Sequence, residues 1–216
     1  MVVTEKKTIA EIIDSLQGYT KVFIVGCGEC STTCKTGGVE EVVNMRQELE
    51  KQGKLVVGSC IPEAPCIAAK LKSEMAKHMA ELRQAEACLV LSCGLGVQSV
   101  KDNDRFNLAV VPGNDTCFTA AMNAKGEFLE KCSLCAECVL ASTGGICPVT
   151  LCAKGLLNGP CGGMNKGKCE TDPEKDCAWV LIYKQLEKNK TMDNYKKMRP
   201  ARDYSKSLRP RKKVLV

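Results

Sequence analysis

The sequence is poor in the side chains that many enzymes and metal sites depend on. Its 216 residues include one histidine, one tryptophan, four tyrosines and four phenylalanines. A metal site built from imidazoles is therefore excluded, because His78 alone cannot supply the four ligands of a structural zinc site. The sequence also offers no nucleophile–base pair of the kind that covalent catalysis requires.

Long apolar runs are also missing. No stretch approaches the ~20 apolar residues of a membrane helix. The N-terminal residues 1–7 are not followed by the apolar core of a secretory signal. We therefore expect a cytoplasmic protein without a membrane span. Apolar residues make up 44% of the chain and charged residues 26%, which is ordinary for a globular protein.

Cysteine is abundant instead, with 16 residues. Cysteines of a cytoplasmic protein stay reduced, and clustered reduced cysteines usually bind metal or carry out redox chemistry. A disulfide framework would require an exported chain and is the less favoured alternative.

The first part of the chain has the pattern of a small α/β domain. Helical apolar patterns run over 39–49 and 67–82, and Thr8 with Glu11 forms a capping box that predicts an earlier helix. The order, a helix followed by β-α-β-α-β-β, predicts an α/β fold with a small doubly wound parallel sheet over residues 1–125. The runs that suit strands buried on both faces are 22–26, 55–58, 88–92 and 108–111.

Cysteines follow the ends of three of these predicted strands. Cys27, Cys60 and Cys93 are evenly spaced in the sequence, and the carboxyl ends of parallel strands share one edge of a sheet. We therefore expect these thiols to converge as metal ligands. Cys30 and Cys34 add two further candidate ligands to the first of these loops.

Other cysteines of this half are interpreted differently. Cys88 lies inside a strand run, where a thiol is usually a small buried apolar side chain. Cys66 and Cys117 also fall near the predicted edge. The turn at residues 26–28 begins like a dinucleotide-binding loop but lacks its third glycine, so a nucleotide site is the weaker alternative.

Residues 126–187 form a predicted cysteine-rich metal-binding domain. Three cysteines spaced Cys-x2-Cys-x2-Cys are typical of ferredoxin-type [4Fe–4S] sites. Eight residues, where ferredoxins have three, precede the Cys-Pro that follows, so the role of that cysteine is open. A zinc ion held by four of the last five cysteines is an alternative. The candidate ligands are Cys132, Cys135, Cys138, Cys147, Cys152, Cys161, Cys169 and Cys177.

Residues 188–216 form a basic tail, with eleven Lys and Arg against two Asp. Such a tail is typical of an arm that binds a partner subunit or of a disordered end. An arm that binds nucleic acid is less favoured, because the tail has few aromatic residues to stack on bases and the rest of the chain is slightly acidic.

Several segments together resemble a known family, the methylenetetrahydrofolate reductase C-terminal domain. This domain forms the small subunit of methylenetetrahydrofolate reductases in acetogenic and related bacteria. The resemblance covers about residues 5–187, and Asn-Gly-Pro-Cys-Gly-Gly is its most specific part. The segments are 26–34, 36–38, 92–98, 144–150 and 152–163.

The resemblance implies an electron-transfer subunit of one-carbon metabolism in the Wood–Ljungdahl pathway. Such a subunit carries [4Fe–4S] clusters, here two or more, with zinc as a further metal. Its partner is a catalytic β/α barrel that carries the flavin and reduces methylenetetrahydrofolate to methyltetrahydrofolate. The electron donor is a further subunit or a ferredoxin. The alternatives are a small subunit of a hydrogenase-like or heterodisulfide-reductase-like complex, and a zinc-stabilised nucleic-acid-binding protein.

Overall fold

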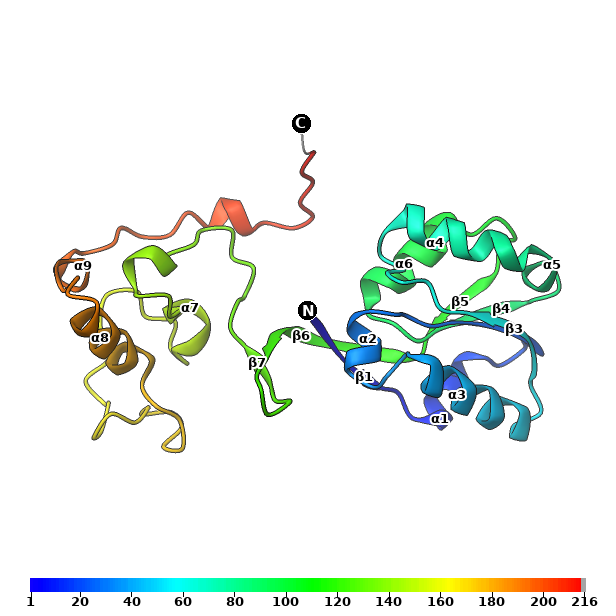
Figure 1. The fold of residues 1–216 in the computed structure, drawn as a ribbon, viewed down its shortest axis with the longest axis horizontal. Helices are drawn as coiled ribbons and strands as arrows, with labels where there is room; N and C mark the ends of the chain where they lie inside the picture. Colours follow the sequence, from blue (N-terminus) through cyan, green and yellow to red (C-terminus); the bar gives the residue numbers. More distant parts are fainter. Residues whose placement is uncertain (215–216) are drawn as a thin grey trace. The chain divides into compact units, whose positions relative to one another are not determined.

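A computed structural model describes residues 1–214 and contains two compact units, Met1–Phe118 and Thr119–Val216 (Figure 1). The division falls within strand β6 (Asn114–Met122). The expected end of the α/β domain at residue 125 lies just beyond that strand. The separation of a cysteine-rich domain from a basic tail stays a prediction.

Strands and helices alternate through most of the first unit. Among the elements up to β5, β1, α2 and α6 were not expected from the sequence. Helix α6 escapes the periodicity argument because it begins Gly94-Leu-Gly96, and glycine is a poor helix former. The elements are β1 (Val2–Lys6), α1 (Ile9–Ser15), β2 (Lys21–Val25), α2 (Cys30–Thr33), α3 (Val39–Lys51), β3 (Leu55–Cys60), α4 (Ala68–Met75), the 3-10 turn η1 (Ala76–His78), α5 (Met79–Leu82), β4 (Ala87–Val90), α6 (Gly94–Asn103) and β5 (Ala109–Pro112).

The predicted doubly wound parallel sheet is confirmed. Its strand order is β3-β2-β4-β5, and each neighbouring pair is parallel. In the sheet, β3 lies on one side of β2, and the later strands β4 and β5 lie on the other side. The direction in which strands are added therefore reverses between β2 and β4. Sheets of this kind place ligands at the carboxyl ends of the strands, at the point of reversal. The loops that follow β2 and β4 carry Cys27 and Cys93.

Alternate residues of the central strands fill two cores, one on each face of the sheet. Ile24 and Leu89 pack with residues of α1 and α3, whereas Phe23 and Cys88 pack with residues of α4 and α6. Figure 1 shows the two pairs of helices on opposite sides of the sheet. Cys88 is fully buried, which confirms that it is a core residue. The Thr8–Glu11 capping box that starts α1 is also present.

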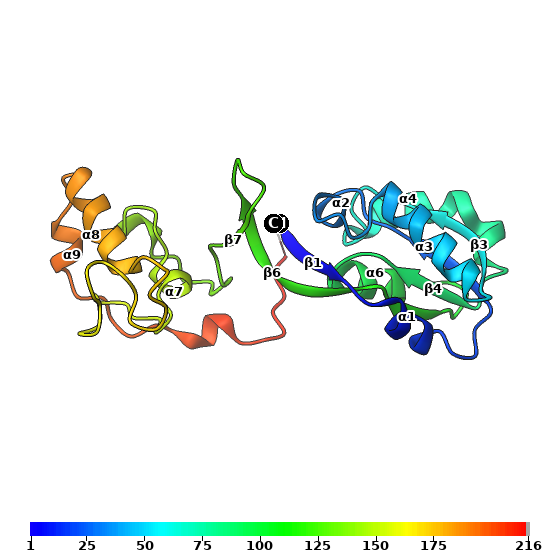
Figure 2. The same cartoon turned by 90° about the horizontal axis from the view of Figure 1, so that it is seen from below.

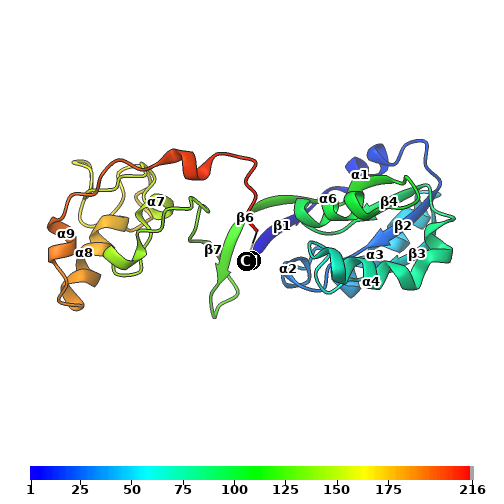
Figure 3. The ribbon, with the colours of Figure 1, turned by 90° about the horizontal axis from the view of Figure 1, so that it is seen from above.

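The second unit consists mostly of loops. The antiparallel pairing of β6 with β7 forms a hairpin, which stands out in Figures 2 and 3. A small core surrounds Trp179 of α8, whose ring N–H donates to the Leu156 carbonyl at 2.9 Å. None of the helices within residues 1–214 has the length and apolar character of a membrane span. The elements after β6 are β7 (Phe128–Glu130), η2 (Leu140–Ser142), α7 (Pro148–Leu151), α8 (Ala178–Lys188), α9 (Asp193–Lys196) and η3 (Tyr204–Ser207).

Glu86 fixes the start of β2. Its carboxylate accepts hydrogen bonds from the backbone N–H groups of Thr20 at 2.6 Å and Lys21 at 3.0 Å. These bonds hold the pKa of Glu86 below its ordinary value of 4.5. A carboxylate with a lowered pKa stabilises the fold above the unfolded-state pKa, and this contribution is lost as the pH falls through the folded-state pKa.

We therefore expect Glu86→Gln to lower the midpoint temperature of unfolding more at pH 7 than at a pH below the folded-state pKa of Glu86. Thermal unfolding followed by circular dichroism at both pH values measures the difference. An equal loss at the two pH values would contradict the assigned role of the carboxylate.

Candidate metal centres

Four cysteines of the first unit lie close together at the carboxyl edge of the parallel sheet. Cys27 follows β2, Cys30 begins α2, Cys66 lies in the loop after β3 and Cys93 precedes α6. The pKa of the Cys66 thiol is raised, mainly by burial and further by the sulfurs of Cys93, Cys27 and Cys30. We call Cys27, Cys30, Cys66 and Cys93 the sheet-edge set.

Close approach of the backbone holds the first of these loops over the strand end. The Cys27 N–H donates to the Gly37 carbonyl at 2.8 Å. Gly37 has no room for a side chain, because a Cβ there would overlap the Leu91 carbonyl. The sulfur of Cys30 accepts a hydrogen bond from the Val2 N–H at 3.5 Å.

Cys34 and Cys117 lie toward β1 and β6. The thiol of Cys34 donates to the Val2 carbonyl at 3.8 Å. The pKa of Cys117 is raised by burial, by Glu5 and Asp115, and more weakly by Cys34. Of the predicted ligands in the loop after β2, Cys34 is therefore the one that lies near Cys117.

Cys60 lies in the hydrophobic core. It packs in the same cluster as Leu71, Met75 and Cys88, and burial raises the pKa of its thiol to about 12, with a further contribution from Glu74. These surroundings favour a protonated thiol over a metal-bound thiolate. That Cys60 binds a metal stays a prediction from the sequence. The thiol from this part of the chain that belongs to the sheet-edge set is Cys66, in the loop after β3.

In the second unit, the cysteines of the Cys-x2-Cys-x2-Cys-x8-Cys motif line one cavity of about 310 Å³. The loop folds back on itself through left-handed backbone at Leu134 (φ 55°) and Ala136 (φ 61°). The Leu134 N–H lies 3.5 Å from the Cys132 sulfur, to which it donates. Cys147, whose role was open from the sequence, shares the cavity wall. The triplet set comprises Cys132, Cys135, Cys138 and Cys147.

The other cysteines of this unit line a much smaller cavity, of about 20 Å³. Cys177 precedes α8 and is buried beside Trp179. The Cys177 N–H donates to the Gly167 carbonyl at 2.8 Å, which draws the preceding loop onto the helix start. We call these four cysteines the inner set, which comprises Cys152, Cys161, Cys169 and Cys177.

Polar groups surround two members of the inner set. The Cys161 thiol donates to the Glu170 carboxylate at 3.1 Å, and the same carboxylate pairs with Lys154. The pKa of Cys169 is lowered by hydrogen bonds with the side chain and backbone of Thr171. Hydrogen-bond donors beside a thiol, as at Cys169, stabilise its thiolate form.

Each set has four thiols, which is the number and kind of ligand that zinc and [4Fe–4S] clusters require, but the thiols are farther apart than the ligands of a bound metal ion. Within residues 1–214, no group of three or more Cys, His, Asp or Glu side chains is close enough to hold a metal ion. Four sulfurs around one zinc lie ~2.3 Å from it, so the inner set would have to draw together. Each thiolate of a [4Fe–4S] cluster binds a different iron, and such ligands surround a larger space. The four thiols around the larger cavity fit that arrangement.

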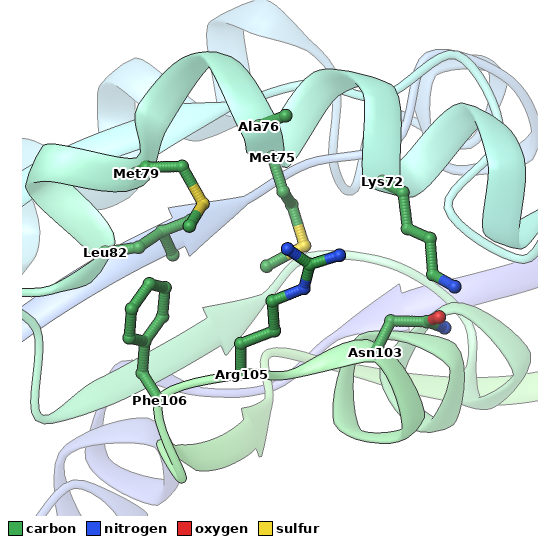
Figure 4. Close-up of a pocket in the computed structure, with 8 residues that line it drawn as sticks. All are labelled: Lys72, Met75, Ala76, Met79, Leu82, Asn103, Arg105 and Phe106. Carbon is green, nitrogen blue, oxygen red and sulfur yellow. The ribbon is translucent and has the colours of Figure 1, made fainter.

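A separate cavity in the first unit has no cysteine in its lining. Its volume is about 60 Å³, and Figure 4 shows Met75, Met79 and Phe106 around it with the Arg105 guanidinium reaching toward Met75. His78 packs on the Phe23 ring, with 5.9 Å between the ring centroids. These groups belong to the packing of α4 and α5 rather than to a thiol site.

Alkylation of the reduced, metal-free chain tests these surroundings. We expect Cys60 to react roughly a hundredfold or more slowly than Cys132, because Cys60 is buried with a raised pKa and only a thiolate reacts readily. Mass spectrometry of timed iodoacetamide reactions at pH 8 measures both rates, and Cys88 is the buried control. Equal rates for Cys60 and Cys132 in the folded chain would show that the core placement of Cys60 is incorrect.

Comparison with known proteins gives a match in the C-terminal part of the chain. No curated protein and no solved structure matches the chain significantly. Residues 111–205 match the family model described as "Methylene-tetrahydrofolate reductase C terminal". This segment contains the triplet set and the inner set. Over residues 111–205, the chain is therefore similar to the methylenetetrahydrofolate reductase C-terminal family.

Proposed function

We propose that this chain is the iron–sulfur electron-transfer subunit of a cytoplasmic methylenetetrahydrofolate reductase complex. One observation carries the proposal. The family segment contains a ferredoxin-like cysteine motif whose four thiols line a single cavity. A [4Fe–4S] cluster bound there would accept and release one electron at a time.

The residues of the chain would hold and insulate that cluster. Cys132, Cys135, Cys138 and Cys147 supply the thiolates, and the Leu134 N–H stabilises the charge on the Cys132 sulfur. Apolar side chains of Val139, Leu140 and Val149 complete the wall. Cys132 and Cys138 are exposed, so this edge of the loop is the side from which a partner would be reached.

The other two sets are proposed to hold different groups. The inner set suits a structural zinc ion, because its cavity of about 20 Å³ is small and four thiolates with no open position form a closed site. The sheet-edge set is proposed to hold a second [4Fe–4S] cluster. Its thiols lie where doubly wound sheets bind ligands, and they come from three separate segments of the chain.

The partner that we propose is the flavin-bearing β/α barrel that reduces methylenetetrahydrofolate to methyltetrahydrofolate. The chain would pass electrons to or from that flavin, and a further subunit or a ferredoxin would supply them. The cysteines at the edge of a doubly wound sheet also suit a small subunit of a hydrogenase-like or heterodisulfide-reductase-like complex. The identity of the bound flavoprotein separates these proposals.

Metal analysis of oxygen-free preparations tests the three sets. We expect Cys132→Ala to lose iron and labile sulfide while it keeps zinc, and Cys161→Ala to lose zinc while it keeps most iron. Cys66→Ala should lose part of the iron. Cys60→Ala and Cys88→Ala are the matched controls, because both residues lie in the core, and they should keep all three components.

A wild-type chain without iron and sulfide would overturn the cluster assignment. If Cys60→Ala loses iron and Cys66→Ala keeps it, the fourth ligand at the sheet edge is Cys60 of β3 and not Cys66. Thermal unfolding of each variant shows whether a loss of metal follows from a loss of the fold.

Co-expression with a flavin-bearing methylenetetrahydrofolate reductase barrel tests the partner. We expect the two chains to co-purify. When this chain is first reduced and then mixed with the barrel, we expect the flavin absorbance to bleach within the mixing time. The Cys132→Ala chain should still bind but deliver electrons at least about tenfold more slowly, because it lacks the cluster that we propose carries electrons to the flavin. Unchanged electron delivery by Cys132→Ala would exclude the triplet set from the route.

A further inference from the structure

The segment after α9 runs back to the cysteine loop of its own unit. In Figure 1 it follows α9 and passes the loop between β7 and α7. Three arginines of this segment make the contacts, and each donates to a backbone carbonyl in or near that loop. We call Arg199, Arg202 and Arg211 the arginine strap.

Arg199 anchors the strap. Its guanidinium donates to the Ser142 carbonyl at 3.0 Å and to the Leu157 carbonyl at 2.9 Å. The same group lies 5.6 Å from the centroid of the Trp179 ring. The side chain of Asn158 also pairs with the Arg199 backbone in both directions, at 2.8 and 3.0 Å. This end of the strap is therefore fixed to the small core of the unit.

Arg202 lies over the middle cysteine of the triplet set. Its side chain is only 10% exposed, and one N–H donates to the Cys135 carbonyl at 3.3 Å. Its Nε is buried and has no hydrogen-bond partner among the described residues, although it lies 4.0 Å from the Glu137 carboxylate. A buried guanidinium N–H without an acceptor is costly, and an anion beside it would remove that cost.

Arg211 covers the preceding residue of the loop. Its guanidinium donates to the Leu134 carbonyl at 3.0 Å. Leu134 and Cys135 are adjacent, so two successive carbonyls between the thiols each accept from a different arginine. On its other side, Cys138 faces a cavity of about 280 Å³ that Arg199 and Arg202 also line.

Both positive and negative side chains lie around the loop that carries Cys132, Cys135 and Cys138. Glu137 is the one carboxylate within the loop, and its side chain contacts Arg202 and Lys206 as ion pairs at 4.0 and 3.7 Å. The Asp203 N–H also donates to Glu137, at 3.0 Å. Cations and one anion therefore stand beside the same thiols, in a site that is partly closed to water.

We propose that the arginine strap is a positioning device that raises the reduction potential of the group held by the triplet set. This inference rests on the proposed function. Reduction adds one negative charge, and a nearby fixed cation stabilises the reduced form more than the oxidised form. Arg202 is the principal member, because its side chain is only 10% exposed and it contacts the backbone of the ligand residue Cys135 itself. Glu137 opposes it.

Redox titration of the full-length chain, followed by electron paramagnetic resonance, tests the strap. We expect Arg202→Gln to shift the midpoint potential of one signal to a more negative value and Glu137→Gln to shift the same signal to a more positive value. Arg202→Lys keeps the charge and should restore most of the potential. Lys190→Gln is the control, because it removes an exposed cation of the basic tail that lies before α9 and outside the strap.

Opposite shifts in the two variants are an outcome that a merely structural role would not give. Shifts in the same direction, or an unchanged potential in Arg202→Gln with its iron intact, overturn the strap. If Arg202→Gln loses iron, Glu137→Gln and Arg202→Lys decide the question by the same potential. A wild-type chain that lacks iron instead overturns the proposed function, and the metal analysis identifies that case before any potential is measured.

Discussion

Thiolates held close together repel one another, and the arrangement of this chain follows from that constraint. A cysteine that is buried without a compensating charge keeps its proton, as the raised pKa of Cys60, about 12, illustrates. Thiols that are to bind metal must instead lie beside N–H donors, cations or the metal itself. The sixteen free cysteines divide along this line. Cys60 and Cys88 fill the core, while most of the others lie in loops and at helix starts.

The two units meet this constraint in different ways. The first unit has two apolar cores, and it presents its thiols on loops that a rigid sheet positions. The second unit has one small core around Trp179. Its cysteine loops are held by backbone hydrogen bonds and by the arginine strap. A domain with so small a core commonly depends on bound metal for stability. Metal binding by its eight thiols would therefore bear on folding as well as on electron transfer.

Most of the first unit could be predicted from local sequence patterns. Buried strands read as continuous apolar runs, so β2, β3, β4 and β5 were found within one or two residues, and the doubly wound order followed from their alternation with helices. Helix α6 was missed because its two glycines weaken the pattern. Whether a cysteine at the end of a strand points into the core or lies in the loop at the edge of the sheet was harder to predict. Cys60 ends a strand, and the pleat turns its side chain into the core, whereas Cys66 lies farther along the loop.

The triplet could also be recognised from its spacing, but the grouping of the remaining cysteines could not. Cys147 and Cys152 are close in sequence, and spacing alone would join them as one pair. The short helix α7 separates them, so that each faces a different cavity.

The contacts of the tail were likewise beyond sequence reasoning, because they join residues far apart in the chain. A run of basic residues usually indicates a solvated end or a surface for an anionic partner. Here three of its arginines bind carbonyls and a ring of their own unit. The positive charge of the segment is directed, at least in these side chains, toward the thiols of the same chain. Charge that compensates thiolates can thus come from distant sequence as well as from metal, and the placement of Arg202 beside Cys135 is where both would act on the same sulfur atoms.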